Sequence, residues 1–284
     1  MKVSLKNAKR RTQLWVLTAL LFAGTLITVV VSRLLNSFGF LDSLLVFVLP
    51  ALLCAYLFSD NLWNYLHLTT PVNWKIVGLT VLSVIAVYPF INLLNVLNQS
   101  MVLPEALHGL EEWMRASETA VEAVLKKILY VNNVWEFIRN VLTMCLLAAV
   151  GEELTFRGVL TNILKKGDKM KPVMTIWVVA IIFSAIHFQF YGFVPRMLLG
   201  AYFGYLVYYT QSLWMPIIAH FTHNFISIAT CTAFQDAPDK MEQVDQIGSG
   251  STLWLSGVSV VLFALIFRQI IIFFHIHCCI KNKL

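Results

Sequence analysis

The sequence LWVLTALLFAGTLITVVV, residues 14–31, is an uncharged and mostly apolar segment near the start of the chain. As an α-helix it would be about 27 Å long, close to the ~30 Å hydrocarbon core of a bilayer. It follows a basic segment, as in signal peptides, but it exceeds their usual apolar region of ~7–15 residues and no clear cleavage site follows. We therefore expect an anchoring transmembrane helix over residues 13–32.

The rest of the chain has the composition of a membrane protein. Hydrophobic residues make up 58% and charged residues 13% of the 284 positions, and the mean hydropathy is +0.74. A soluble globule could not bury this much apolar surface. The predicted fold is an all-α, polytopic membrane helix bundle with about eight transmembrane helices. Besides the first, we expect them at residues 42–58, 73–95, 134–165, 172–190, 195–210, 213–234 and 252–275.

One segment between these spans has a different pattern. In residues 96–133, charged and apolar side chains alternate with helical spacing, which predicts an amphipathic helix at the membrane interface. The chain then divides into N-terminal helices with this amphipathic helix (1–133), a central core (134–234), and an outer loop with the last helix (235–284). We expect the three parts to form one integrated membrane domain.

The net charge of +6 arises from basic residues at the N-terminus, in residues 165–171 and in residues 281–284. Lys and Arg are enriched on the cytoplasmic side of membrane proteins, and with eight spans all three places fall on one side. We therefore expect both termini in the cytoplasm. The short basic N-terminus and compact loops are typical of a bacterial cytoplasmic membrane. The distribution indicates membrane lipid as a partner and no binding to nucleic acid.

Charged residues also occur where a membrane helix should have none. The sequence AAVGEELTFRG, residues 148–158, places Glu152, Glu153 and Arg157 in an apolar helix, about 20 Å from the basic loop that follows. Each such charge costs at least ~2.5–3.5 kcal/mol at the bilayer centre. Glu153 and Arg157 are four residues apart, so they can pair on one helix face. Glu152 is left without this partner, which suits a general base.

Histidines follow in two later spans. His187 lies about 24 Å from the same basic loop, at a depth similar to that of Glu152. His220 and Asn224 share one face of a further span, whereas His223 points elsewhere and is interpreted as a spare side chain, its role left open. One Glu with two His could form a zinc site or perform metal-free acid–base chemistry. The His-Glu-x-x-His signature of zinc proteases is absent, and spacing alone leaves both possibilities open.

These residues form three motifs in order along the chain: Glu-Glu-x-x-x-Arg, Phe-x-x-x-His and His-x-x-x-Asn. The set resembles the motifs of the type II CAAX prenyl protease and bacteriocin-processing family, also called CPBP or Abi intramembrane proteases. The resemblance covers about residues 135–230. The motif positions are Glu152, Glu153, Arg157, Phe183, His187, His220 and Asn224.

The resemblance implies an intramembrane endopeptidase, a class commonly labelled as metalloproteases. Glu152 would activate water for attack on a peptide carbonyl with the help of His187, and His220 and Asn224 would stabilise the oxyanion. If a metal such as zinc is present, Glu152, His187 and His220 are its candidate ligands. The substrate would be a membrane-associated peptide or protein.

The remaining motif residues have supporting roles in this interpretation. Glu153 and Arg157 would orient the site, and Phe183 belongs to the motif of His187. Two other functions remain open: a polytopic transporter, because intramembrane carboxylates and histidines also build proton relays, and a non-catalytic immunity or binding protein on the same scaffold.

Overall fold

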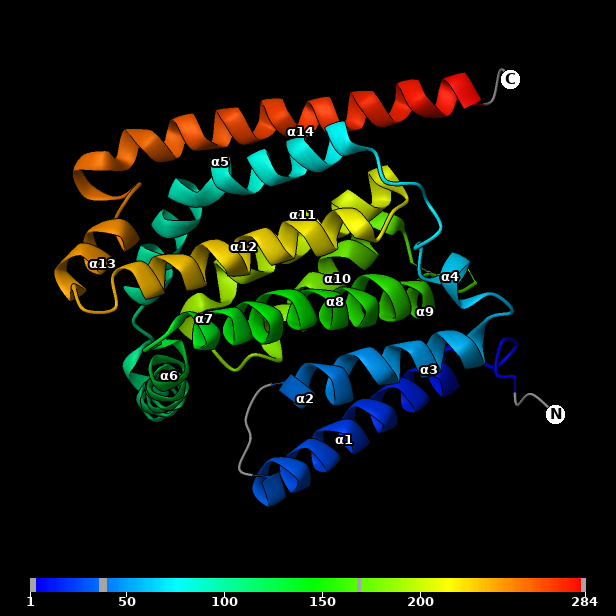
Figure 1. Ribbon diagram of the computed structural model, residues 1–284, viewed down its shortest axis with the longest axis horizontal. Helices are drawn as coiled ribbons and strands as arrows, with labels where there is room; N and C mark the ends of the chain where they lie inside the picture. Colours follow the sequence, from blue (N-terminus) through cyan, green and yellow to red (C-terminus); the bar gives the residue numbers. More distant parts are fainter. Residues whose placement is uncertain (1–3, 36–39, 168–169, 282–284) are drawn as a thin grey trace.

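The computed structural model describes residues 4–35, 40–167 and 170–281. Throughout these residues the regular structure is helical and no strand occurs, which confirms the predicted all-α class (Figure 1). Three basic residues used to predict the orientation, Lys2, Lys169 and Lys283, lie outside the described residues.

The N-terminal part is a pair of long helices. The helix α1 (Arg10–Leu35) packs against a second helix built of α2 (Phe40–Ser43), a π-helical turn η1 (Leu44–Val48) and α3 (Leu49–Phe58). The short α4 (Leu62–Tyr65) follows. The pair lies along one side of the molecule, as Figure 1 shows in blue.

The opposite side is formed by another pair, α5 (Trp74–Gln99) and α14 (Leu253–Lys281), which lie side by side. α5 extends beyond the predicted end at residue 95. The polar side chain of Asn98, near the end of the helix, has hydrogen-bond partners for both of its groups. Its Nδ2 donates to the Phe190 carbonyl at 3.3 Å, and its Oδ1 accepts from the Val194 N–H at 2.9 Å.

Between the two pairs lies the helix that carries the first motif. It runs without a break through α7 (Val134–Asn140), η3 (Val141–Leu147), α8 (Ala148–Glu153), η4 (Leu154–Leu160) and α9 (Thr161–Lys165). The segments η3 and η4 are π-helical, a geometry that often occurs at functional sites. A Cβ on Gly151 would lie 2.9 Å from the Phe47 Cβ, so this glycine allows η1 to approach just before the two glutamates.

The other two motifs lie beside this one on further helices. These are α10 (Pro172–Ala185), the short turn η5 (Phe190–Gly192), α11 (Phe193–Thr210) and α12 (Trp214–Ala233). His187 is the exception, since it lies in the turn after α10, which ends at Ala185 and so before the predicted end of this span at residue 190. α10 packs along α11, and α12 contacts α5, α8 and η3. A last short helix, α13 (Pro238–Asp245), and the turn η6 (Gly250–Thr252) lead into α14.

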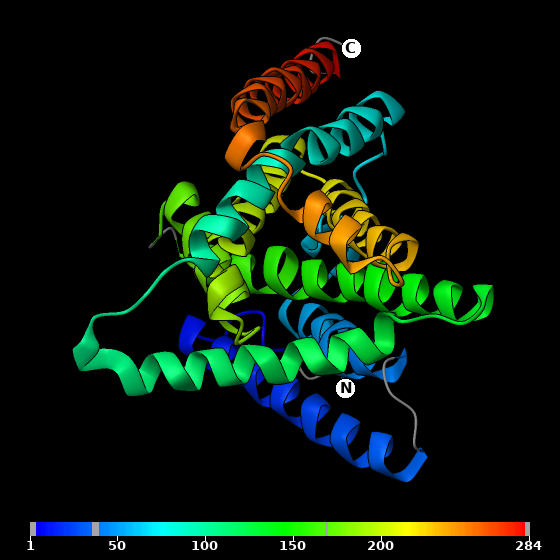
Figure 2. The same cartoon turned by 90° about the vertical axis from the view of Figure 1, so that its left-hand side faces the viewer.

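The predicted amphipathic segment forms a 3-10 turn η2 (Glu105–Leu107) and the helix α6 (His108–Leu129). Figure 1 shows α6 nearly end-on and Figure 2 shows it crossing the molecule, so it lies transverse to most of the other helices. This direction agrees with an interfacial helix, although its location at a membrane surface remains a prediction.

Contacts at its first turns attach α6 to neighbouring loops. The Glu111 carboxylate accepts from the Leu103 N–H at 2.8 Å and from Arg115 at 2.7 Å, and these two donors hold the pKa of Glu111 below its usual value. The Arg115 guanidinium lies 4.3 Å from the ring centre of Tyr191, whose N–H donates to Glu118 at 2.9 Å. α6 therefore supports the turn between α10 and α11.

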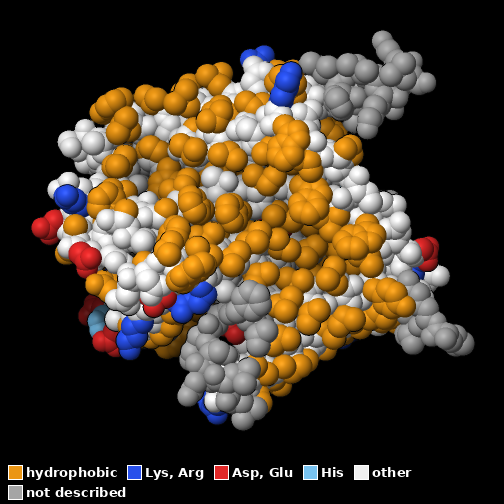
Figure 3. Space-filling model, viewed as in Figure 1, with side chains coloured by type: hydrophobic (Ala, Val, Ile, Leu, Met, Phe, Trp, Pro, Cys, Tyr) orange, Lys and Arg blue, Asp and Glu red, His pale blue; other side chains and the backbone are white. Residues whose placement is uncertain are grey.

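Hydrophobic side chains also cover much of the outside of the molecule. Figure 3 shows them across the broad middle of one face, with many of the charged side chains toward the edges. Among the described residues, four helices are long and apolar enough to cross a membrane, at Arg10–Arg33, Trp74–Gln99, Val134–Lys165 and Pro238–Phe274. Two shorter apolar helices are Leu44–Phe58 and Pro172–Ala185. The count of about eight spans remains a prediction.

Candidate active site

Three of the predicted site residues meet at the carboxylate of Glu152. This residue lies in α8, between the two π-helical segments. Its Oε2 atom is buried and has no hydrogen-bond partner among the described residues. It lies 4.0 Å from His187 Nε2 and 3.9 Å from His220 Nε2. Residues from α8, from α12 and from the turn after α10 therefore place two imidazoles around one carboxylate.

His187 is held in a defined orientation. It follows the C-terminal end of α10, and its Nδ1 atom lies 2.7 Å from the Phe183 carbonyl oxygen. A carbonyl only accepts, so Nδ1 carries the hydrogen in this contact. The neutral ring then has its lone pair on Nε2, the atom directed toward Glu152. This arrangement suits a group that accepts a proton.

The second glutamate is part of a buried network. Glu153 and Arg157, which are 0% and 1% exposed, form the predicted ion pair at 2.8 Å. The same Glu153 oxygen accepts from His220 Nδ1 at 2.9 Å, and Arg157 Nη2 donates to the Gly200 carbonyl of α11 at 2.9 Å. The network therefore joins the motif helix to α11 and α12 and fixes the ring of His220.

Phe183 lies at the centre of these groups. The Arg157 guanidinium is 4.4 Å from its ring centre, and the rings of His187 and His220 lie 5.1 and 5.9 Å from it. A cation over an aromatic face is stabilised by the ring quadrupole. Phe183 thus packs under both histidines and partly compensates the buried charge of Arg157.

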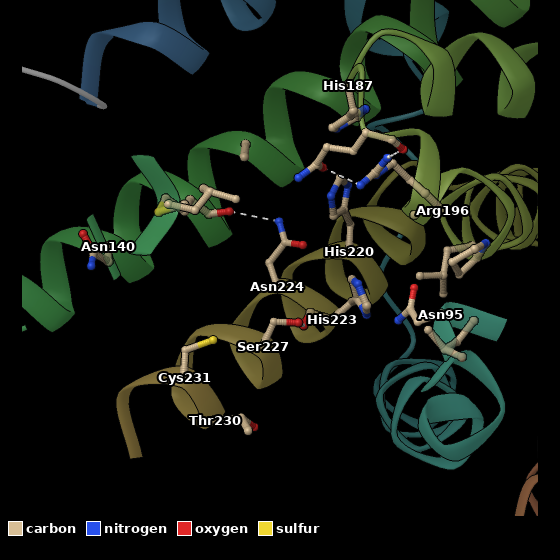
Figure 4. A pocket seen from close by; sticks show the side chains of 18 of the residues that line it. Asn95, Asn140, His187, Arg196, His220, His223, Asn224, Ser227, Thr230 and Cys231 are labelled. Carbon is tan, nitrogen blue, oxygen red and sulfur yellow. Dashed lines mark hydrogen bonds between the residues drawn. The ribbon is translucent and has the colours of Figure 1, made fainter. Parts of the chain in front are cut away.

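Asn224, the last motif residue, is bonded to the motif helix rather than to Glu152. It is one turn along α12 from His220, and its amide donates to the Met144 carbonyl of η3 at 2.9 Å (Figure 4). One amide hydrogen is occupied by this contact, which leaves the second hydrogen available to a ligand. Asn224 lines the same cavity as Glu152 and the two histidines.

This cavity has a volume of about 920 Å³ and is bordered by several helices. It continues along α12, where Figure 4 shows a row of polar side chains that includes His223, Asn224, Ser227 and Cys231. At its far end it is lined by residues of α6 and α13. The predicted site therefore belongs to a long polar cavity inside an apolar protein, and His223, interpreted as spare, also faces it.

The sequence analysis did not single out two polar residues of this cavity, Arg196 and Gln189. Arg196 lines the cavity from α11, and its Nη2 atom donates to the Gln189 side-chain oxygen at 2.5 Å. Arg196 falls within a predicted span, but in its first turn, where an Arg side chain can extend to the membrane interface, so its signal was weaker than that of Glu152. Gln189 lies in the connection before η5 and carries no comparable signal.

The donor atoms do not fit a resident zinc ion as they are placed. Within the described residues, no group of three or more His, Cys, Asp or Glu side chains is positioned to hold a metal. Ligands ~2.0–2.1 Å from a tetrahedral zinc lie only about 3.3 Å from one another. The distances of 4.0 and 3.9 Å from Glu152 Oε2 to the two Nε2 atoms exceed this value.

The fold and the site together define a class: an all-helical protein with apolar helices long enough to cross a membrane and a carboxylate–imidazole cluster in its interior. Residues 134–226, from α7 into α12, match the family described as type II CAAX prenyl endopeptidase Rce1-like. This core of the chain is Rce1-like, which confirms the family predicted from the three motifs. Comparison with curated proteins and with solved structures gives no match. The family implies an endopeptidase in a membrane.

Proposed function

We propose that this protein is an intramembrane endopeptidase that hydrolyses a peptide bond in a membrane-associated peptide or protein. The observation that carries the proposal is the buried Oε2 of Glu152, which faces two imidazole nitrogens at 4.0 and 3.9 Å inside a cavity of about 920 Å³. The Rce1-like match of residues 134–226 supports the same class of reaction.

The distances around Glu152 suit the activation of one water molecule. Separations of 4.0 and 3.9 Å are too long for direct hydrogen bonds, but one water can lie about 2.8 Å from both atoms of such a pair. Glu152 then acts as the general base that removes a proton from this water, and the Nε2 lone pair of His187 holds and orients it.

The reaction balances with these groups alone. The water oxygen bonds to the peptide carbonyl carbon, its proton moves to Glu152, and the carbonyl π electrons move to the oxygen. Glu152 then delivers the proton to the amide nitrogen, the C–N bond breaks, and the products are a carboxylic acid and an amine. No step requires an additional cofactor.

Two donors can stabilise the oxyanion. Asn224 offers the amide hydrogen that is not bonded to Met144. His220 Nε2 can donate only when the ring carries both hydrogens, because its Nδ1 already bonds to Glu153. Glu153 and Arg157 are positioning residues in this scheme.

The shape of the cavity suggests how substrate reaches the site. Its far end is lined by Leu125, Lys127 and Ile128, which belong to the amphipathic helix α6. A peptide attached to the membrane surface can enter beside this helix and extend along the polar row of α12. We propose an integral protein of a bacterial cytoplasmic membrane with both termini cytoplasmic.

Replacement of His187 tests this assignment. In proteoliposomes with a lipid-anchored fluorogenic peptide, His187→Ala is expected to lower kcat by a factor of about 10²–10⁴, because the water loses the group that orients it. His108→Ala is the matched control, since His108 is an exposed histidine on α6. Equal rates for the two variants would contradict the role of His187. Peptide transport without cleavage by the wild type would favour a transporter instead.

Metal dependence is tested on the same preparation. Because the donor distances do not fit zinc, we expect the purified protein to cleave the peptide at an unchanged rate after treatment with a strong chelator. Elemental analysis should find no stoichiometric zinc. Stoichiometric zinc whose removal stops cleavage and whose return restores it would require Glu152, His187 and His220 to be reassigned as ligands.

A further inference from the structure

Arg196 is a cation in the cavity to which the proposed reaction assigns no role. It lies on α11, four residues before Gly200, whose carbonyl accepts a hydrogen bond from Arg157 of the motif helix. Residues four apart on a helix share a face and are separated by about 6 Å. Arg196 therefore faces the cavity one turn from the point where α11 contacts the motif helix. Figure 4 shows it beside His187 and His220.

The guanidinium of Arg196 is held in place on one side. Nη2 donates to the Gln189 side-chain oxygen at 2.5 Å, and Nη1 donates to the Gln189 carbonyl at 3.4 Å. A Cβ on Gly192 would lie 3.2 Å from Nη2, so the glycine at this position leaves room for the guanidinium. Two of the five N–H donors are thus used, and the orientation of the group is fixed before any ligand binds.

No carboxylate of the described residues lies within 4.0 Å of Arg196. Glu118, on α6, bonds instead to the Tyr191 N–H. A half-buried cation in an apolar protein is costly unless an anion compensates it. In contrast, Arg157 in the same protein has Glu153 at 2.8 Å. Glu118 and Glu152 act on Arg196 only from beyond ion-pair distance, so its free N–H groups can bind the carboxylate of a ligand directly.

We propose that Arg196 binds a carboxylate of the peptide substrate, a few residues from the bond that is cleaved. The planar guanidinium can hold a carboxylate through two parallel hydrogen bonds, which suits this class of ligand. The carboxylate is either the free C-terminus of the peptide or the side chain of an Asp or Glu. This assignment rests on the proposed peptidase function, because it names what the same cavity selects.

The test compares two pairs of lipid-anchored fluorogenic peptides in proteoliposomes. One pair differs only in a free or an amidated C-terminus, and the other carries Asp or Asn near the cleaved bond. The wild type is expected to cleave the carboxylate form of one pair with a kcat/KM about tenfold or more above that of its neutral form. Arg196→Gln should remove this preference, and Arg196→Lys should keep part of it. The pair that responds identifies the source of the carboxylate.

Arg139→Gln is the matched control, because Arg139 is an exposed arginine that also lines the cavity and contacts Asn140. It should keep the full preference. A wild type without a preference in either pair, or an Arg196→Gln variant that retains it, would overturn the proposal. The Arg196→Lys variant keeps the charge, so it provides the comparison if Arg196→Gln yields little folded protein.

Binding measurements separate this inference from the proposed function. In the Glu152→Gln background, the same four peptides are titrated by fluorescence anisotropy against detergent-purified protein. Preferential binding of the carboxylate form should persist in Glu152→Gln and disappear in the Glu152→Gln/Arg196→Gln double variant. If the preference depends on Arg196 but the wild type never cleaves a peptide, the carboxylate site stands and the peptidase assignment fails. If the wild type cleaves the peptides but shows no preference that depends on Arg196, the peptidase assignment stands and the carboxylate site fails.

Discussion

Glu152→Gln is expected to lower kcat by a factor of about 10³ or more, equivalent to a rise of about 4 kcal/mol in the activation barrier. The amide has nearly the same size as the carboxylate but cannot accept a proton from water, so the general base is lost and the shape of the site is retained. The Oε2 atom of Glu152 is buried without a hydrogen-bond partner among the described residues. The thermal unfolding temperature should therefore stay close to that of the wild type, because the substitution breaks no hydrogen bond of this atom and keeps the size of the side chain.

The experiment uses single-turnover cleavage of the lipid-anchored peptide by reconstituted protein. Glu122→Gln serves as the control, since it removes an exposed carboxylate from α6, and it should retain the full rate. If folded and membrane-inserted Glu152→Gln cleaves at the rate of the wild type, Glu152 is not the base. A large fall in unfolding temperature would show that the carboxylate has a structural role instead.

Arg157→Met is expected to have the largest effect on stability, lowering the free energy of unfolding by about 3–5 kcal/mol. The substitution leaves the carboxylate of Glu153 in the interior without its cation and removes the donor to the Gly200 carbonyl. Both groups are then buried and poorly satisfied, which is more costly than the loss of the pair as a whole. The expected result is a lower unfolding temperature in detergent and a lower yield of inserted protein.

Two further variants make this prediction specific. Arg115→Met breaks the Arg115–Glu111 pair of α6, which has the same spacing of four residues. Because the Arg115 side chain is 47% exposed, this substitution should lower the free energy of unfolding much less than Arg157→Met. The double variant Glu153→Gln/Arg157→Met removes both charges and should regain part of the lost stability. If the double variant is as unstable as the sum of the single variants, the two residues do not act as a pair.

Much of the helical fold could be predicted because its signal is local. Apolar runs long enough to cross a bilayer occur at the positions of α1, α5 and the helix Val134–Lys165. The i to i+4 spacing of Glu153 and Arg157 predicted their ion pair, since helix geometry alone brings such residues together. The end of α5 was predicted too early, because the partners that satisfy Asn98 come from the distant turn η5 and from the first turn of α11.

The arrangement of the site could be predicted only in part. The three motifs and the family follow from residue types and spacing, but the distances among Glu152, His187 and His220 depend on how three helical segments pack. The tautomer of His187 depends on its contact with the Phe183 carbonyl. The hydrogen bond from Asn224 to the Met144 carbonyl depends on the packing of α12 against η3.

The sequence by itself determined the all-helical membrane class, the Glu153–Arg157 pair and the family, because each depends on composition or on spacing within one segment. Only the tertiary structure decided that Glu152 has two imidazoles around it, that Arg157 is anchored on Gly200, and that Arg196 faces the same cavity. These contacts join residues far apart in the chain, for example 43 positions for Arg157 and Gly200. Such contacts arise from the packing of whole helices, and the periodicity of residues within one segment does not report which helices pack together.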